Sequence, residues 1–354
     1  MKNEKAGEGR DDRTRKGEKA GRGRDDGERL PFFAVEESMD TTNPMQQVAA
    51  ALAAGRLILL DGATGTELQR RGAAMHDTAW CAAATLTDPD LLLAVHRDYI
   101  LAGADVITTN TFSTNRPMLE AAGLGAQLAE INRRAVAIAR AARDQAAVAR
   151  PVVIAGSLSH QVPVIAGTDF RDPAAVPDRR TAAADFAEIA TILATAGVDL
   201  LLLEMMSDPD LALPAIAAAA ATGLPVWVGL SARLEADGRL VSYHRRELSF
   251  AEVAATIIGA GGGSAYGIMH SPVAAIAPCL EIIRRRWSGP LLAYPDSGVF
   301  RMPQWVFEDI IAPNHLARLA RQWRNSFGIG ILGGCCGLGP EHIRELARLK
   351  DNGD

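Results

Sequence analysis

The chain has 354 residues, of which 48% are hydrophobic and 22% charged, a composition typical of a globular protein that can bury a large core. Its net charge of −5 gives no reason to expect nucleic acid or an anionic membrane as a partner. Four cysteines are too few for a disulfide framework, so we expect a reducing compartment, the cytoplasm.

The first part of the chain is a charged segment. Residues 1–40 mix Lys, Arg, Asp, Glu and Gly and contain almost no apolar residue before Leu30. Such a segment cannot bury enough surface to offset the entropy of ordering, so we predict a disordered charged tail. It lacks the apolar core of a signal peptide, and its many acids argue against an organellar transit peptide.

From Met45 onward, short apolar runs alternate with segments that are typical of helices. The predicted strands are Leu57 to Leu60, Asp105 to Thr109, Pro151 to Ala155, Val198 to Leu203, Val226 to Leu230, Ala265 to Met269, Leu291 to Tyr294 and Gly328 to Leu332. The predicted helices are Pro89 to Ala102, Ala126 to Ala147, Ala182 to Ala196, Pro209 to Ala221, Phe250 to Gly259, Pro272 to Arg286, His315 to Phe327 and Glu341 to Leu349.

Eight strands in strict alternation with eight helices predict a parallel sheet closed into a (β/α)₈ TIM barrel over residues 45–350. A doubly wound open sheet would also alternate, but eight units favour the barrel. The uncharged run from Leu211 to Leu230 could span a bilayer by length. Because Pro214, Gly223 and Pro225 divide it into a helix, a turn and a strand, we expect no membrane segment.

Active sites of such barrels lie at the carboxyl ends of the strands. Cys335 and Cys336 follow the last strand between glycines that permit a turn, so both sulfurs can face one ion. Adjacent Cα atoms, about 3.8 Å apart, are too close for an ordinary disulfide. His270 follows the sixth strand on the same rim. A Cys, Cys, His set with one open position is a catalytic zinc site, and Zn²⁺ is the cofactor we predict.

Each of these residues also has an ordinary structural interpretation. Buried cysteines often pack as small hydrophobes, and a single histidine is more often a satisfied or solvent-facing side chain. Glu204, at the end of the fourth strand, could hold a substrate ammonium or form a salt bridge with a base in a loop. Asp61, after the first strand, could belong to the site or cap a helix.

Several stretches resemble the homocysteine S-methyltransferase family, over roughly Leu57 to Leu349. The matching stretches are Leu59 to Gly72 (LLDGATGTELQRRG), Ala102 to Phe112 (AGADVITTNTF), Ala155 to Ser157, Asp199 to Glu204, Tyr294 to Gly298 (YPDSG), and Gly333 to Gly337 followed by Pro340, His342 and Ile343. The resemblance implies a zinc barrel that methylates the thiol of homocysteine to give methionine.

The same resemblance assigns roles to single residues. Cys335 and Cys336 would be zinc ligands, and homocysteine would be bound through its amino and carboxylate groups. The residues implied for that binding are Asp61, Gly62, Thr111 and Glu204. The methyl donor would be S-methylmethionine, S-adenosylmethionine or betaine, a sulfonium or ammonium compound whose leaving group departs neutral. The partners are then small molecules, and an oligomer is possible.

Two positions depart from the family pattern. The third zinc ligand is usually a cysteine after the sixth strand, whereas this chain has His270. Two thiolates and an imidazole around Zn²⁺ form a neutral core, so a substrate thiolate there is less electron-rich than beside three thiolates. Asp296 stands where the family usually has a neutral amide.

These departures leave two further functions open. One is a related zinc methyltransferase with another thiol or selenol as acceptor. The other is a catalytically silent barrel that binds an amino acid or a partner protein. This alternative stays open because His270 replaces the usual cysteine ligand.

Overall fold

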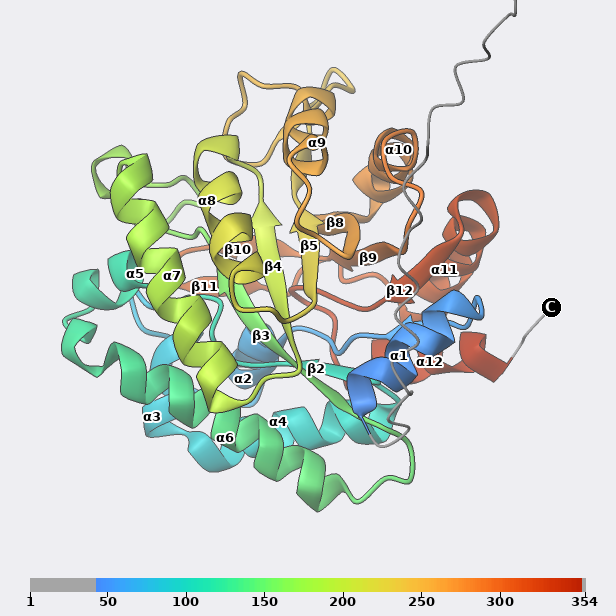
Figure 1. Ribbon diagram of the computed structural model, residues 1–354, viewed down its shortest axis with the longest axis horizontal. Coiled ribbons are helices and arrows are strands. Elements are labelled where there is room, and N and C mark those ends of the chain that lie inside the picture. Colours follow the sequence, from blue (N-terminus) through green and yellow to red (C-terminus); the bar gives the residue numbers. More distant parts are fainter. Residues whose placement is uncertain (1–42, 352–354) are drawn as a thin grey trace, which may run out of the picture. The chain divides into compact units, whose positions relative to one another are not determined.

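A computed structural model describes residues 43–351, and the predicted charged tail over residues 1–40 lies outside this part of the chain. Eight parallel strands form one sheet in the order β1-β12-β9-β8-β5-β4-β3-β2. A parallel bridge between Leu60 and Val106 joins the two outer strands and closes the barrel. Figure 1 shows these strands at the centre with helices around them. The predicted (β/α)₈ barrel is therefore confirmed.

The predicted strands and helices all form, with small shifts at their ends. The barrel strands are β1 (Ile58–Leu59), β2 (Val106–Thr108), β3 (Val153–Ser159), β4 (Leu200–Met206), β5 (Val226–Leu230), β8 (Ala265–Pro272), β9 (Leu291–Asp296) and β12 (Ile329–Leu332). The helices that alternate with them are α4 (Pro89–Ala102), α6 (Leu128–Ala146), α7 (Arg179–Ala196), α8 (Pro209–Ala220), α9 (Phe250–Gly259), α10 (Val273–Arg284), α11 (Pro313–Phe327) and α12 (Pro340–Asp351).

Helix boundaries follow local chemistry. Ser249 begins α9 with a capping box, because its hydroxyl accepts from the Glu252 amide while the Glu252 carboxylate accepts from the Ser249 amide. Asp178 caps α7 through the amides of Arg180 and Thr181. Gly103 ends α4 at φ 116°, a left-handed value that glycine adopts without steric cost.

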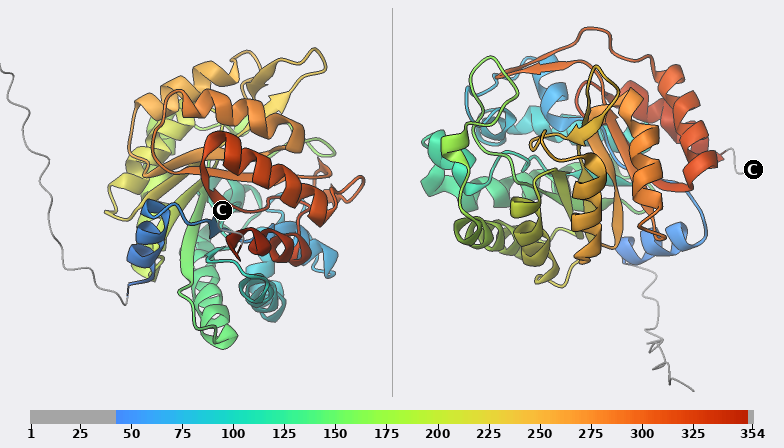
Figure 2. Two further views of the ribbon diagram at one scale, coloured as in Figure 1. Left: turned by 90° about the vertical axis from the view of Figure 1, so that its right-hand side faces the viewer. Right: turned by 90° about the horizontal axis from the view of Figure 1, so that it is seen from above.

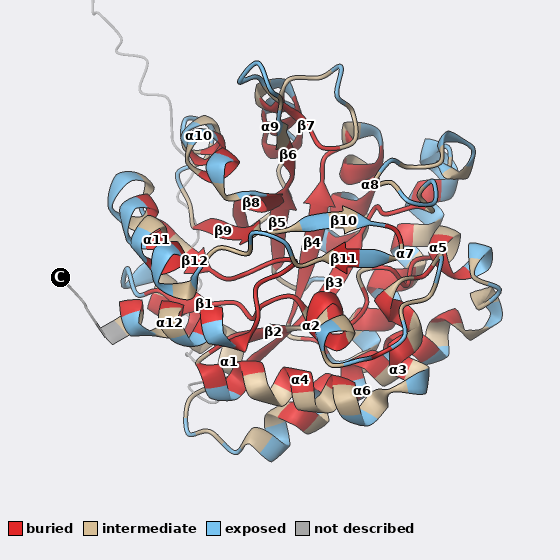
Figure 3. Cartoon of the chain, turned by 180° about the vertical axis from the view of Figure 1, so that it is seen from behind, coloured by how far each residue is buried: buried red, intermediate tan, exposed pale blue. Residues whose placement is uncertain are grey.

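The core has two layers, set by the alternation of side chains along each strand. On β4, Leu200 and Leu202 face the barrel interior, whereas Leu201 and Leu203 pack against the surrounding helices. Figure 2 shows the helices on the outside of the strands from two further directions. In Figure 3 the barrel strands are buried and the outward surfaces of the helices are exposed.

Several elements lie outside the predicted alternation. Helix α1 (Pro44–Ala53) contacts β1 and β3, and its Val48 and Ala51 join the interior core. Two antiparallel hairpins also extend the loops after β5 and β9. The added elements are β6 (Ala232–Leu234), β7 (Leu240–Ser242), β10 (Val299–Arg301), β11 (Gln304–Val306), α2 (Thr64–Arg70), α3 (Ala84–Thr87), α5 (Arg116–Ala121) and the 3₁₀ turns Cys81–Ala83, Gly125–Gln127 and Pro173–Ala175.

Four strands run further than the apolar pattern predicted, and one of them is β9, which continues to Asp296. Strand β3 continues to Ser159, β4 to Met206 and β8 to Pro272, so Glu204 and His270 lie within strands rather than after them. The pairing register shifts between Leu203 and Met206 and between Met269 and Pro272. Such bulges let a strand carry polar side chains toward a site while it stays in the sheet.

Candidate metal and substrate site

A cavity that is partly open to solvent lies at the carboxyl ends of the barrel strands. Most of the residues predicted for the site line it: Asp61, Gly62, Glu204, His270, Cys335 and Cys336. Thr111 does not, because its hydroxyl is turned away and donates to the carbonyl of Ser157 at 2.7 Å. Its neighbours Asn110 and Phe112 both face the cavity instead.

The cysteine pair lies on a short bend after β12. The amide of Gly334 donates to the carbonyl of Asp61 at 3.1 Å, and the amide of Cys335 donates to Pro295 O at 2.8 Å. The amide of Gly337 donates to Thr66 Oγ1 at 3.0 Å. These bonds tie the bend to the loop after β1, to the end of β9 and to α2. The two sulfurs lie 4.0 Å apart.

His270 faces the cysteines from β8. Its φ of 39° is left-handed, a strained value for a residue with a side chain, and it falls at the bulge of this strand. The Nδ1 atom lies 3.6 Å from Cys335 Sγ, and one ligand atom from each of His270, Cys335 and Cys336 lies within 4.8 Å of the other two. The predicted three residues therefore meet at one point.

Two of the separations within this triad fit a zinc ion. With Zn–S near 2.3 Å and Zn–N near 2.0 Å, tetrahedral geometry places two sulfurs about 3.8 Å apart and a sulfur and a nitrogen about 3.5 Å apart. The observed separations of 4.0 Å and 3.6 Å are close to these values. Each of the three residues is at most 9% exposed, so a bound ion would be largely shielded from water.

The three groups also shift one another's protonation. The contact with the Cys336 sulfur, together with His270, lowers the pKa of the Cys335 thiol well below its usual value. The same sulfur contact raises the pKa of Cys336. Burial works to lower the pKa of His270, but its contact with Cys335 raises it overall. Without an ion, Cys335 is thus the thiol most readily deprotonated, as a soft metal requires.

Two buried carboxyl groups stand beside the triad. Asp61 accepts hydrogen bonds from the Thr108 amide at 2.7 Å and from the Thr108 hydroxyl at 2.9 Å, yet burial raises its pKa to about 7. Burial, with Cys335 nearby, raises the pKa of Glu204 to about 8, although Ser157 donates a hydrogen bond to it. A cationic partner such as an ammonium group would lower these pKa values and stabilise the charged carboxylates.

Aromatic rings form much of the remaining wall. Trp80 contacts Phe112 and Phe300 edge to face, and Trp305 contacts Phe300 and the ring of His270. No lysine or arginine lines the cavity within residues 43–351. Ring faces without a competing basic side chain attract positively charged ligands.

Four buried polar atoms of the wall have no hydrogen-bond partner among the described residues. They are Trp80 Nε1, Gln161 Oε1, His244 Nε2 and Tyr294 Oη. An unpaired buried polar atom is costly, so these four atoms reduce the stability of the cavity wall.

Sequence reasoning missed the wall residues that the loops contribute, among them Trp80, Tyr243 and Trp305. One available signal was the pair Asp237 and Gly238, which predicts a hairpin turn and marks the loop that ends at Tyr243. Trp80 and Trp305 carry no comparable local signal, because their position depends on contacts far apart in the chain.

Comparisons with known proteins agree with this geometry. The profile described as homocysteine S-methyltransferase matches residues 58–349. The homocysteine S-methyltransferase YbgG of Bacillus subtilis (strain 168) is 28% identical over 86% of this chain and 97% of its own length. The selenocysteine methyltransferase of Astragalus bisulcatus is 28% identical over 85% of this chain and 94% of its own length.

Solved structures give the same result. The crystal structure of the homocysteine methyltransferase MmuM from Escherichia coli, metallated form, is 25% identical to the chain, with a TM-score of 0.66. The match covers 87% of this chain and 100% of that one.

Proposed function

The chain belongs to the homocysteine S-methyltransferase family, and from that premise we propose that residues 45–350 form a zinc-dependent, homocysteine-binding methyltransferase. It would transfer a methyl group from a sulfonium or ammonium donor to the thiol of homocysteine, giving methionine. The observation that carries this proposal is the meeting of His270, Cys335 and Cys336 at one wall of the cavity. All four cysteines are free, which fits a cytoplasmic enzyme.

In this proposal His270, Cys335 and Cys336 would hold zinc, with a fourth position open for the acceptor. A free thiol is only a few per cent ionised at neutral pH, and bound zinc would supply the charge that deprotonates it. Because each residue of the triad is at most 9% exposed, little water would reach a sulfur bound directly beside them. The departing group is a neutral sulfide or amine, so no general acid is required of the protein.

The two carboxyl groups with raised pKa values would orient the acceptor. Asp61 and Glu204 lie beside the triad and favour an ammonium group, so the amino end of homocysteine would bind there while its thiol faces the cysteines. Gly62 contributes backbone at the same point. A Cβ on Gly62 would lie 2.4 Å from the carbonyl of Leu338, so only glycine fits.

The aromatic wall would bind the donor. A sulfonium or ammonium group is attracted to the faces of Trp80, Phe300 and Trp305, and no basic side chain of the described cavity wall repels it. The transferred methyl would then lie between the donor and the acceptor sulfur, where orientation accounts for much of the rate. The donor is S-methylmethionine, S-adenosylmethionine or betaine in this proposal.

A selenol acceptor is the second candidate. The relative from Astragalus bisulcatus is a selenocysteine methyltransferase and is as similar to this chain as the YbgG protein. Competition between homocysteine and selenocysteine for a limiting donor decides between them, because the preferred acceptor is methylated first.

The proposal is tested by metal analysis of the purified protein with and without His270→Ala, alongside methyl transfer with each donor. We expect about one metal ion per chain in the wild type, weaker retention in the variant, and methionine formed from at least one donor. Full activity in a metal-free protein would refute the zinc site. Metal binding without methyl transfer to any thiol or selenol would favour a catalytically silent barrel.

A further inference from the structure

The imidazole of His270 has a hydrogen-bonding partner on the side opposite the cysteines. Its Nδ1 faces Cys335 Sγ at 3.6 Å, whereas its Nε2 lies 3.4 Å from the hydroxyl of Tyr243. That hydroxyl lies 3.0 Å from Asp169 Oδ2. A line of polar contacts therefore runs from the carboxylate of Asp169 through the hydroxyl of Tyr243 to the imidazole of His270, one of the three residues of the metal triad.

The direction of the hydrogen bonds along this line follows from its end. A carboxylate can only accept, so the hydroxyl of Tyr243 donates to Asp169. The phenol oxygen is then left to accept the proton on Nε2 of His270. A neutral imidazole with its proton on Nε2 has its lone pair on Nδ1, the atom that faces Cys335. The line thus selects the tautomer that can bind a metal beside the cysteines.

A second carboxylate near His270 cannot do this. Asp296 Oδ2 lies 3.7 Å from Nδ1, the nitrogen that faces Cys335, and this distance is too long for a hydrogen bond. A proton held between Asp296 and Nδ1 would also block the atom needed as a ligand. Within the described residues, Tyr243 is the group placed to serve Nε2.

Tyr243 is itself held rigidly. The guanidinium of Arg233 lies 3.8 Å above its ring, donates to its carbonyl at 2.8 Å, and donates to Asp169 Oδ2 at 2.7 Å. Arg233 comes from β6 and Tyr243 directly follows β7, so both belong to the hairpin after β5. The ring, the backbone and the hydroxyl of Tyr243 each have a separate contact.

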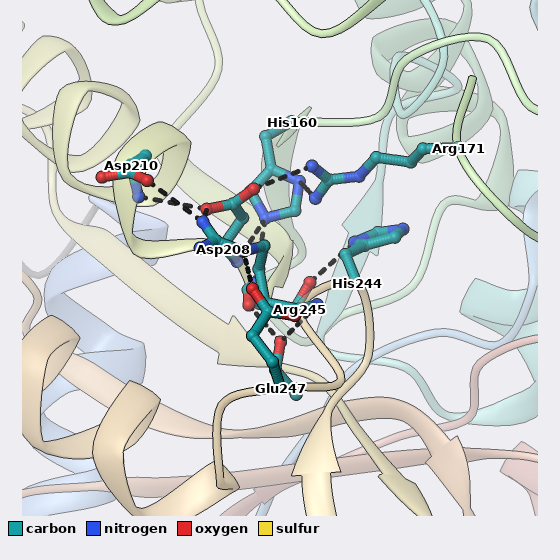
Figure 4. A network of polar contacts seen from close by, with 9 residues as sticks. His160, Arg171, Asp208, Asp210, His244, Arg245 and Glu247 are labelled. Carbon is teal, nitrogen blue, oxygen red and sulfur yellow. Dashed lines mark hydrogen bonds and ion pairs between the residues drawn. The ribbon is translucent and has the colours of Figure 1, made fainter. Parts of the chain in front are cut away.

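The next two residues tie this segment to the barrel, as Figure 4 shows. His244 Nδ1 lies 2.7 Å from the hydroxyl of Ser207. Arg245 donates to Asp208 at 3.1 Å, and Asp208 also forms a buried ion pair with Arg171 at 3.0 Å. Since Asp208 caps α8 directly after β4, the hairpin is fixed to the strand that carries Glu204.

We propose that Tyr243 is a positioning residue for the metal site, which holds His270 in the orientation and tautomer that make Nδ1 a ligand. This inference rests on the proposed function, since it concerns the same metal. It explains how the chain uses a histidine in this place. An imidazole ligand needs a partner on its second nitrogen, and such partners typically raise metal affinity by about 10 to 100-fold.

The test is the affinity of the full chain for Zn²⁺ and Co²⁺, measured by competition with a chromophoric chelator. Tyr243→Phe keeps the ring under Arg233 and removes only the hydroxyl, so we expect affinity to fall about 10 to 100-fold. The ligand-field absorption of the Co²⁺-loaded protein should shift as well. Asp169→Asn keeps the tyrosine and should give a smaller loss in the same direction.

Tyr266→Phe is the matched control. Tyr266 is fully buried, its hydroxyl accepts from the Gly263 amide at 3.0 Å, and it does not line the cavity. Loss of the Tyr266 hydroxyl should leave both the metal affinity and the Co²⁺ spectrum unchanged. Thermal unfolding of the metal-free proteins shows whether each variant is folded.

A double-mutant cycle with His270→Cys separates positioning from a general effect on the fold. In the His270→Cys background no imidazole is present, so Tyr243→Phe should cause no further loss of affinity. Equal affinity of Tyr243→Phe and the wild type would overturn the proposal, and so would an equal loss in both backgrounds. A wild type that binds no metal would instead refute the proposed function.

Discussion

The bend that carries the two cysteines depends on Gly337, so Gly337→Ala should disturb both stability and metal binding. Gly337 has φ 83°, and a Cβ there would lie 1.9 Å from the carbonyl oxygen of Ser297. That contact is with backbone, and the Ser297 amide donates to the carbonyl of Cys336 at 2.9 Å. The clash therefore pushes directly against the cysteine pair.

The expected cost has two parts. Placing alanine at a left-handed φ costs about 1 to 2 kcal/mol, and overpacking against fixed backbone adds about 1 to 3 kcal/mol. Gly337→Ala should thus lower the free energy of unfolding by about 2 to 5 kcal/mol. Because the sulfurs move with the bend, Zn²⁺ affinity should fall at least about tenfold, as when the support of a metal ligand is lost.

Gly223→Ala is the matched control. Gly223 has φ 77°, lies in the turn before β5 and has open space where a Cβ would be. It should cost only the conformational part, about 1 to 2 kcal/mol, and leave metal affinity unchanged. Urea unfolding and chelator competition measure both quantities. Equal unfolding free energies for the two variants, with unchanged metal affinity, would refute the reasoning.

Two further substitutions test buried ionisable groups. His96 on α4 is fully buried, and neither of its nitrogens has a partner within residues 43–351. Burial lowers its pKa to about 4, so the folded protein loses stability as pH falls from 6.5 toward 4. His96→Leu should remove about 2 kcal/mol of the stability difference between pH 7 and pH 5, and an unchanged difference in urea unfolding would contradict this. Glu204→Gln keeps an acceptor for Ser157 but removes the carboxylate, so KM for homocysteine should rise about 10 to 100-fold while metal content stays constant. Burial raises the pKa of Glu204 to about 8, so above pH 5 the metal-free Glu204→Gln variant should be more stable than the metal-free wild type, by a margin that grows up to pH 8. Equal KM values for the variant and the wild type would contradict the role of Glu204 in binding.

Much of the barrel could be predicted because its pattern is local. Helices α4 and α9 match their predicted bounds, Pro89 to Ala102 and Phe250 to Gly259, since a capping residue or a glycine marks their ends. The run from Leu211 to Leu230 forms α8 and β5 as predicted, and no helix within residues 43–351 is long and apolar enough to span a bilayer.

Other features could not be predicted because they depend on distant contacts. The apolar runs ended before Glu204 and His270, yet β4 and β8 continue through bulges that pairing with neighbouring strands supports. Thr111 was expected at the substrate site by resemblance, but its hydroxyl is bonded to Ser157 O, on the neighbouring strand. Tyr243 meets His270 only because a hairpin folds back over the barrel.

The candidate metal ligands were identified for a physical reason. The carboxyl-terminal parts of barrel strands share one rim, so His270 near the end of β8 meets Cys335 just after β12, 65 positions away. The resemblance to homocysteine S-methyltransferases, carried by short stretches of sequence, is confirmed over residues 58–349.

X-ray absorption at the zinc edge of the loaded full chain tests the central claim most directly. We expect one ion per chain with two sulfurs at about 2.3 Å and one protein nitrogen at about 2.0 Å, and loss of the nitrogen in His270→Ala. A shell without sulfur, or one that is the same in wild type and His270→Ala, would contradict the joint binding of one ion by His270, Cys335 and Cys336.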